Sequence, residues 1–266
     1  MGPTAGGGNE PNWESLLASA KAHVTAPVVA VEHIESLSSA SEPQKVRGDD
    51  GAVYAVKFLT NRYGNGRAIF TEQVVPLLGR LIDAPVPEVT RIDVTPDLLS
   101  VSSFSVNAAP ATPGLHHGSR WADGFADRMA IDHVDSNREA LGALSVLYTW
   151  LHCAGDQQLI YQNSPPHRVL SVDHSAFFLA SGSWDADLLG TLLPPAAYDP
   201  FFDPAGLSDI DRSPALNLLE RVTPEKIAAA VAAPPDEWGV SQSERVVLAE
   251  VVWLRQVQVL ALSGRV

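Results

Sequence analysis

One lysine of this 266-residue sequence has a setting that suits the binding of anions. Lysine is scarce, with only four among the 18 basic residues, and Lys57 lies inside the apolar run Val53–Phe58. If this run is a strand, alternation places Lys57 on the face opposite Val56 and Phe58. An ammonium group on the inner face of a hairpin strand can clamp the phosphates of a nucleotide. The alternative is a surface lysine on a half-exposed strand.

A carboxylate in the next predicted helix favours the first interpretation. Glu72 stands at the start of Thr71–Ile82, where apolar residues follow a helical spacing. A helix glutamate that pairs with a strand lysine holds the ammonium in position, which is a pattern typical of kinases. Taken alone, Glu72 would be an ordinary first-turn acid, favoured by the helix dipole.

Two aspartates further along the chain complete a set of groups that suits phosphoryl transfer. Asp156 follows the long apolar helix predicted over Asn137–Cys153, and Asp173 ends the short predicted strand Val169–Val172. The strand Leu159–Gln162 lies between them, so the resulting hairpin brings the two carboxylates near one point. In phosphoryl transfer one such carboxylate orients the attacking hydroxyl and another holds Mg²⁺.

Short strings in the same order resemble the HipA-like kinases, which share a two-lobed kinase fold with the phosphatidylinositol kinases. The resemblance extends from about Val31 to Phe178 and covers a little over half of the chain. The strings that carry it are Leu37–Pro43, Tyr54–Phe58, Thr71-Glu72, Ala84–Glu88, Gly114–Ser119, Gly155-Asp156 and Val172–Ser175.

The resemblance implies that the protein binds ATP and Mg²⁺ and assigns roles to residues of this sequence. Lys57 would bind the nucleotide phosphates, and Glu72 would orient Lys57. Asp156 would be the catalytic aspartate, and Asp173 would bind the metal ion.

The sequence after Asp156 departs from the family pattern. The family usually has an asparagine a few residues later as a second metal ligand, whereas Gln157 and Gln158 follow here and the nearest asparagine is Asn163. Gln157 or Gln158 can offer Mg²⁺ a carbonyl oxygen instead, and Gln158 is the expected metal ligand. The basic residue that often follows the catalytic aspartate is replaced by Gln157. Two functions therefore stay open. One is an ATP-dependent phosphotransferase acting on a protein hydroxyl or a small molecule, and the other is an inactive pseudokinase that acts as a nucleotide-binding adaptor.

Three further polar motifs have a structural alternative to a role in chemistry. Ser38 and Ser39 belong to a serine-rich loop that the resemblance places on the phosphate side of the ATP site, although such a loop is more often a solvated turn. The adjacent His116 and His117 should point in different directions, which disfavours a shared metal ion. Cys153 ends an apolar helix, where cysteine is usually a small core residue rather than a nucleophile.

The predicted elements indicate an α+β fold of two lobes, similar to a protein kinase. Residues 1–27 are expected to form a tail and a short helix, and residues 28–94 a β-rich N-lobe that contains the ATP-binding lysine. Residues 95–136 would connect the lobes and line the cleft between them. Residues 137–266 would form a mainly helical C-lobe with the catalytic and metal-binding aspartates.

Composition excludes several other classes of function. The formal net charge of −13 disfavours direct binding of nucleic acid, because phosphate contacts need a basic surface. Cys153 is the single cysteine, so no intramolecular disulfide forms, and a reducing compartment is expected. No apolar run reaches the length of a membrane span, and the N-terminus lacks the pattern of a signal peptide. We therefore expect a cytoplasmic protein with no membrane span.

Overall fold

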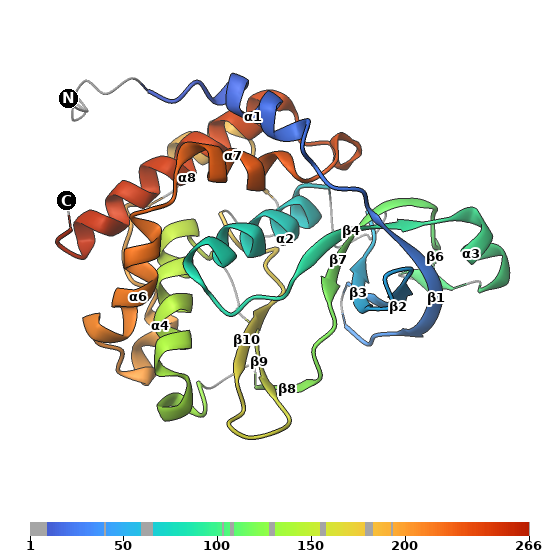
Figure 1. Cartoon of the computed structure of the whole chain (residues 1–266), viewed down its shortest axis with the longest axis horizontal. Coiled ribbons are helices and arrows are strands. Elements are labelled where there is room, and N and C mark those ends of the chain that lie inside the picture. The colour runs from blue at the N-terminus through green and yellow to red at the C-terminus, as the bar shows by residue number, and fades with distance from the viewer. Residues whose placement is uncertain are drawn as a thin grey trace.

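A computed structural model describes residues 10–39, 41–59, 66–102, 104–106, 109–127, 131–154, 158–178, 183–192 and 194–265. The N-terminal region is rich in strands and the C-terminal region is mainly helical, as the sequence predicted (Figure 1). No helix in the described part of the chain combines the length and the apolar character needed to cross a membrane.

The N-terminal region is a closed barrel of five strands. In barrel order the strands are β1 (Val28–Ser36), β2 (Gln44–Gly48), β3 (Val53–Lys57), β7 (Gly114–Arg120) and β4 (Val89–Val94). All neighbours are antiparallel except β1 and β4, which are parallel. The predicted hairpin of β2 and β3 is confirmed, and its turn ends at Gly51, whose φ of 80° favours glycine. The buried side chains Val46, Val56 and Ile92 belong to the barrel core.

One helix packs between the barrel and the helical region. The helix α2 (Gly66–Gly79) continues as the 3₁₀ turn η1 (Arg80–Ile82), so it begins five residues before the predicted start at Thr71. Most of its side chains are buried, including the polar Glu72 and Gln73. It contacts β4 and β7 on one side and α4 and α7 on the other (Figure 1). This position explains why polar side chains on α2 meet partners from both regions.

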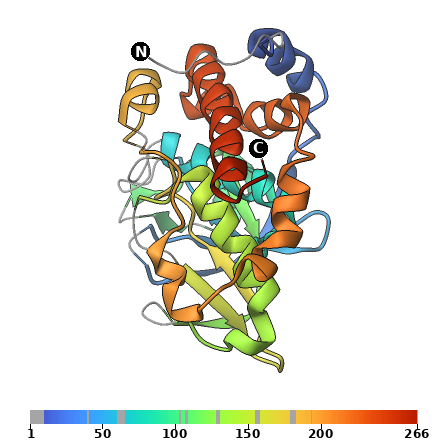
Figure 2. The ribbon, with the colours of Figure 1, turned by 90° about the vertical axis from the view of Figure 1, so that its left-hand side faces the viewer.

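The helical region surrounds the long buried helix α4. The helices there are α1 (Trp13–Lys21), α4 (Val134–Leu151), α5 (Ala186–Leu192), α6 (Asp209–Leu219), α7 (Pro224–Ala232) and α8 (Gln242–Leu262), with the 3₁₀ turns η3 (Pro200–Ala205) and η4 (Asp236–Trp238). Seen from the helical end, α4, α6 and α8 lie in front of the strands (Figure 2). The predicted capping box of α8 is confirmed, because Ser241 and Glu244 bond reciprocally.

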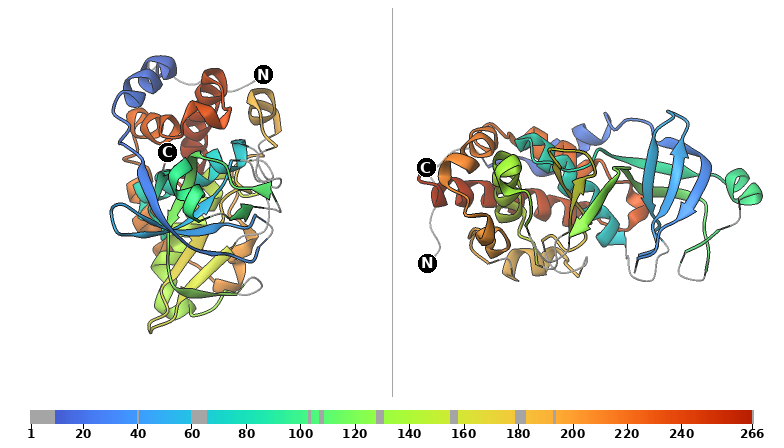
Figure 3. Two further views of the ribbon diagram at one scale, coloured as in Figure 1. Left: turned by 90° about the vertical axis from the view of Figure 1, so that its right-hand side faces the viewer. Right: turned by 90° about the horizontal axis from the view of Figure 1, so that it is seen from below.

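A small second sheet lies between the barrel and the helices. Its strands are β8 (Gly124–Asp127), β9 (Gln158–Gln162) and β10 (Val169–Val172), in the order β10-β9-β8 (Figure 3). The hairpin predicted after α4 is therefore confirmed. Its register pairs Val172, the last residue of β10, with Gln158, the first residue of β9, so Asp173 follows directly after this pair.

The predicted connector between residues 95 and 136 contains regular structure that the sequence pattern did not reveal. It includes α3 (Pro96–Val101), the short pair β5 (Ser105–Val106) and β6 (Ala109–Pro110), and the barrel strand β7. The residues of β7 have weak β propensity, and the strand is fixed by pairing with β3 on one side and β4 on the other. This pairing places His117 directly opposite Lys57.

Candidate active site

The structure brings Lys57, Glu72 and Asp173 together as a buried ionic triad. The Lys57 Nζ atom forms an ion pair with the Glu72 carboxylate and another, of 2.7 Å, with Asp173 Oδ1. The Lys57 side chain is 16% exposed and that of Glu72 only 4%, whereas 34% of the Asp173 side chain is exposed. Lys57 is therefore not a surface lysine, and Asp173 is the member of the triad most open to solvent.

A backbone contact joins Glu72 to the segment that carries Asp173. The amide of His174 donates a 2.9 Å hydrogen bond to Glu72 Oε2, while Glu72 Oε1 pairs with Lys57. Asp173 itself has a left-handed backbone, with φ of 61°, directly after β10. This conformation is uncommon for a residue other than glycine and is most frequent at functional or strained sites. It turns the chain so that the Asp173 side chain and the His174 amide both face α2.

The charges of the triad shift one another's pKa values. Burial alone would lower the pKa of Lys57, but the carboxylates of Glu72 and Asp173 hold it above its ordinary value. Burial raises the pKa of Glu72 to about 7, in spite of the nearby ammonium. Burial would also raise the pKa of Asp173, yet Lys57 holds it well below its ordinary value. Lys57 thus favours the ionised form of Asp173, whereas burial disfavours the ionised form of Glu72.

The triad borders a cavity of about 270 Å³ between the barrel and the second sheet, which we call the central cavity. Its lining residues come from the loop after β1, from β3, α2, β4, β7, β8, β9 and β10, and from segments next to these strands. They are Leu37, Ser39, Ser41, Pro43, Ala55, Lys57, Glu72, Pro76, Pro87, Val89, His117, Ser119, Arg120, Trp121, Ala122, Gly124, Gln158, Ile160, Val172, Asp173 and His174. Aliphatic side chains and one tryptophan mix here with a few convergent polar groups, as is usual for sites that bind small molecules.

The structure places some of the remaining predicted site residues at the central cavity and others away from it. Gln158 lines the cavity near Asp173, as the register of β9 and β10 requires. Ser39 lines it as well, whereas its exposed neighbour Ser38 does not. Asp156 lies outside the described residues, so its position relative to the triad stays a prediction.

Two buried hydrogen-bonded groups lie behind the triad, and the sequence did not single out their members Tyr148, Ser171 and Gln73. In the first, His174 Nε2 is 3.1 Å from Ser171 Oγ, which is 2.6 Å from the hydroxyl of Tyr148 on α4. In the second, His117 Nδ1 is 2.7 Å from Gln73 Oε1 on α2. Burial lowers the pKa of His174 to about 3 and that of His117 well below its ordinary value, so both rings stay neutral.

A weak signal for these residues is present in the sequence. Ser171 alternates with apolar neighbours in a short strand, and Gln73 interrupts an apolar helix; a polar residue at a core position usually has a partner.

The neighbouring histidine His116 points away from the central cavity, as expected for adjacent residues of a strand. Its Nδ1 accepts a 3.1 Å hydrogen bond from the amide of Leu59, and its ring packs 4.1 Å from that of Phe58. The two histidines therefore do not share a metal ion. No group of three or more histidine, cysteine or acidic residues is placed to hold a metal ion anywhere in the described ranges.

Cys153 is half-buried and pairs through its backbone with Phe177, as a structural residue would.

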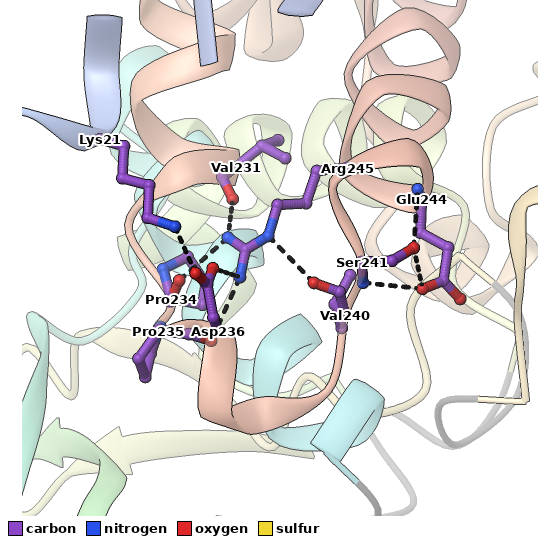
Figure 4. A network of polar contacts seen from close by, with 9 residues as sticks. All are labelled: Lys21, Val231, Pro234, Pro235, Asp236, Val240, Ser241, Glu244 and Arg245. Carbon is purple, nitrogen blue, oxygen red and sulfur yellow. Dashed lines mark hydrogen bonds and ion pairs between the residues drawn. The ribbon is translucent and has the colours of Figure 1, made fainter. Parts of the chain in front are cut away.

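The helix that carries Glu72 is anchored through the loop between α7 and α8. At the centre of this loop the Arg245 guanidinium, only 3% exposed, donates hydrogen bonds to four backbone carbonyls (Figure 4). These carbonyls belong to Val231, Pro234, Pro235 and Val240. The buried charge is thus well solvated by carbonyl groups, and it fixes the shape of the loop.

The loop in turn holds the start of α2. The Trp238 indole donates a 2.9 Å hydrogen bond to the carbonyl of Leu115 in β7, and Arg67 of α2 pairs with Glu244 of α8 through Nε at 3.0 Å. A Cβ atom on Gly66 would lie only 1.8 Å from the Trp238 carbonyl oxygen, so only glycine fits at the first residue of α2. The orientation of Glu72 is therefore coupled to the helical region.

Comparison with known proteins supports a kinase-like fold. No known family model and no curated protein sequence matches the chain. Among solved structures, the Helicobacter pylori proinflammatory kinase CtkA is similar at 11% identity, with a TM-score of 0.53 over 89% of this chain and 94% of that chain. A Golgi casein kinase is similar at 9% identity over 94% of this chain and 75% of that chain; its TM-score of 0.47 is too low to add to the argument. The similarity to CtkA supports the kinase-like fold and does not point to the HipA-like family in particular.

Proposed function

We propose that this protein is an ATP-dependent phosphotransferase with a two-lobed kinase fold, related to the HipA-like kinases. The observation that carries the proposal is the ionic triad of Lys57, Glu72 and Asp173 at the edge of the central cavity. A lysine held by a helix glutamate, next to an aspartate that follows a strand, is the arrangement that kinases use to position nucleotide and metal.

Each residue of the triad has a distinct proposed role. Lys57 supplies a fixed positive charge for the nucleotide phosphates, because its high pKa keeps it protonated. Glu72 orients Lys57 and is itself held by the His174 amide. Asp173, ionised and partly exposed at the cavity, is the residue suited to a metal ion.

The oxygen groups at the cavity fit Mg²⁺ bound together with a nucleotide. Magnesium in such sites takes one or two protein ligands and fills its other positions with phosphate oxygens and water. The Asp173 carboxylate and the Gln158 amide oxygen, both lining the cavity, are oxygen ligands of this kind. When bound, Mg-ATP supplies the phosphoryl group to be transferred. Asp156 would orient the acceptor hydroxyl, belonging to a protein or a small molecule, and the cytoplasm is the expected compartment.

A second candidate function is a pseudokinase that binds ATP as an adaptor. The departure that favours it is the glutamine pair after Asp156, where the family has a basic residue and an asparagine. Both functions require the triad, so the triad does not distinguish them.

The deciding experiment measures binding and transfer separately on the purified chain. Thermal unfolding with Mg-ATP should show a higher melting temperature than with Mg²⁺ alone, because ligand bound to the native state stabilises it. Transfer of the γ-phosphoryl group to the protein itself or to water should then be detectable with radiolabelled ATP. Binding without transfer would favour the adaptor, and no shift in folded protein would refute both functions.

A further inference from the structure

A second cavity, of about 440 Å³, lies against α2 beside the residues that line the central cavity. Its lining residues come from α1 and the segment after it, from α2 and β4, and from α7 and its C-terminal end, and we call it the α1–α2 cavity. Its apolar wall includes Leu16 and Leu77, and its polar wall includes His23, Gln73, Arg91 and Glu225. A volume of this size is typical of sites that bind small molecules.

Two hydrogen-bond donors of this cavity have unused capacity. The Arg91 side chain is half-buried, and its guanidinium forms no hydrogen bond or ion pair with any described residue. Burial lowers the pKa of Arg91, and the charge of Glu237 acts in the opposite direction without forming an ion pair with it. Gln73 is 3% exposed and uses its Oε1 atom toward His117, while its amide nitrogen has no partner among the described residues. A half-buried cation and an amide donor in the wall of one cavity suit an acceptor that carries negative charge.

The remaining lining residues restrict the chemistry of that acceptor. The apolar wall suits a hydrocarbon or aromatic body, and one guanidinium matches the two oxygens of one carboxylate. Glu225 is exposed in the lining of the same cavity, where its charge disfavours a polyphosphate more strongly than a ligand with a single negative charge. We propose that the α1–α2 cavity is a second ligand site, which binds a small monocarboxylate with an apolar body through Arg91 and Gln73.

The walls of this cavity are held in place by contacts outside it. Lys21, the last residue of α1, pairs with Asp236 of the loop after α7 (Figure 4). Arg245 binds the carbonyl of Val231 in α7 at 2.9 Å and also contacts Asp236 at 3.5 Å. The cavity is thus bounded by helices that are tied to one another, so a ligand would not have to assemble it.

The two cavities share a physical connection through α2. Gln73 lines the α1–α2 cavity and bonds to His117, which lines the central cavity opposite Lys57, and Val89 lines both. A ligand that accepts a hydrogen bond from the side-chain amide nitrogen of Gln73 holds this side chain in one orientation, in which Oε1 stays bonded to His117. If the central cavity binds Mg-ATP, as proposed above, occupancy of the second site should strengthen nucleotide binding, and nucleotide should strengthen ligand binding by the same factor.

Binding at the second site is tested without any nucleotide. Calorimetry should detect 4-phenylbutyrate binding to the full chain, and its neutral amide, 4-phenylbutanamide, should bind at least about tenfold more weakly because the charged contact is lost. Arg91→Gln should weaken the binding of 4-phenylbutyrate by a similar factor. Arg221→Gln removes the same charge from an exposed position outside the cavity and should leave the affinity within about twofold of wild type.

The outcomes separate this proposal from the proposed function. Three results would each overturn the second site, whether or not the protein binds nucleotide. They are equal affinities for the acid and the amide, an unchanged affinity in folded Arg91→Gln, and no heat of binding at about 5 mM probe. The coupling is measured as the dissociation constant of Mg-ATP with and without 4-phenylbutyrate, in wild type and in Gln73→Met. We expect tighter nucleotide binding with probe in wild type and no such change in Gln73→Met. If 4-phenylbutyrate binds but the dissociation constant of Mg-ATP in wild type does not change, the proposed coupling is wrong and the proposed second site still stands.

Discussion

The backbone amide of His174 and the carboxylate of Glu72, 102 positions apart in the sequence, are joined by a 2.9 Å hydrogen bond. The same carboxylate pairs with Lys57, so β3, α2 and the segment after β10 meet at one side chain. A carboxylate that accepts from both an ammonium and an amide is held more firmly than by either alone. The position of Lys57 therefore depends on contacts from both the barrel and the second sheet.

Removing the positive charge of the triad should abolish nucleotide binding and cost little of the fold. Lys57→Met leaves the buried Glu72 without its cation, but a carboxyl whose pKa is already about 7 takes up a proton readily. We expect no melting-temperature shift with Mg-ATP and a loss of about 1–3 kcal/mol in unfolding free energy, measured in urea. The control is Lys226→Met, which removes a lysine from the exposed surface of α7. A normal Mg-ATP shift in Lys57→Met would contradict the proposed role of the lysine.

Loss of the anchor of α2 should weaken both the fold and the site. Arg245→Met leaves four backbone carbonyls without their buried donor, and we expect the unfolding free energy to fall by about 2–4 kcal/mol. Because the loop also carries the Trp238 contact with Leu115, the Mg-ATP affinity should decrease in the protein that remains folded.

The matched control for the anchor is Arg221→Met, an arginine on the exposed surface. It should change the unfolding free energy by less than about 0.5 kcal/mol. Equal stability of the two variants would mean that the carbonyls find other partners and that Arg245 does not fix the loop.

The sequence revealed the parts of the site that depend on local pattern. Strand alternation gave the correct face for Lys57, and the hairpin of β9 and β10 placed Gln158 beside Asp173 because turn and register are local properties. Helical periodicity gave α2, although its start was missed by five residues: the first turn is set by Trp238, which packs against Gly66.

The parts that could not be predicted depend on contacts between distant segments. The strand β7 lies in a stretch with little β propensity, and both of its partners, β3 and β4, lie many residues earlier in the sequence. The bond between Gln73 and His117 arises only because β7 closes the barrel beneath α2. Such contacts leave no periodic signal in one sequence, because each joins two polar residues from segments that are far apart in the chain.

The buried neutral histidine behind the triad should make the protein less stable in acid. The pKa of His174 falls from 6.5 to about 3 on folding, so between these values the unfolded chain binds the proton and the native chain does not. Its contribution to stability is complete above pH 6.5 and decreases as the pH falls toward 3. In His174→Gln, the slope of unfolding free energy against pH over this range should be smaller by up to about 1.4 kcal/mol per pH unit.

The comparison is made by urea unfolding of wild type and His174→Gln from pH 4.5 to pH 8. Near pH 8 the histidine is neutral in both states, so the two curves should run parallel there. Glu72, whose pKa is raised to about 7, contributes with the opposite sign in both proteins, and its effect cancels in the difference. Identical slopes at low pH would mean that His174 is protonated in the native protein.

The two aspartates should fail in different ways if they have the proposed separate roles. Asp173 borders the central cavity and is kept ionised by Lys57, so Asp173→Asn should weaken the Mg²⁺-dependent part of ATP binding, by about tenfold or more. Asp156 is proposed to act on the acceptor hydroxyl in the transition state, so Asp156→Asn should lower turnover by about a hundredfold or more while Mg-ATP binding persists. Radiolabelled phosphoryl transfer, measured beside titrations of ATP with and without Mg²⁺, separates the two effects. Wild-type turnover no faster than that of Asp156→Asn, with normal Mg-ATP binding in both, would mean that the chain is a nucleotide-binding adaptor.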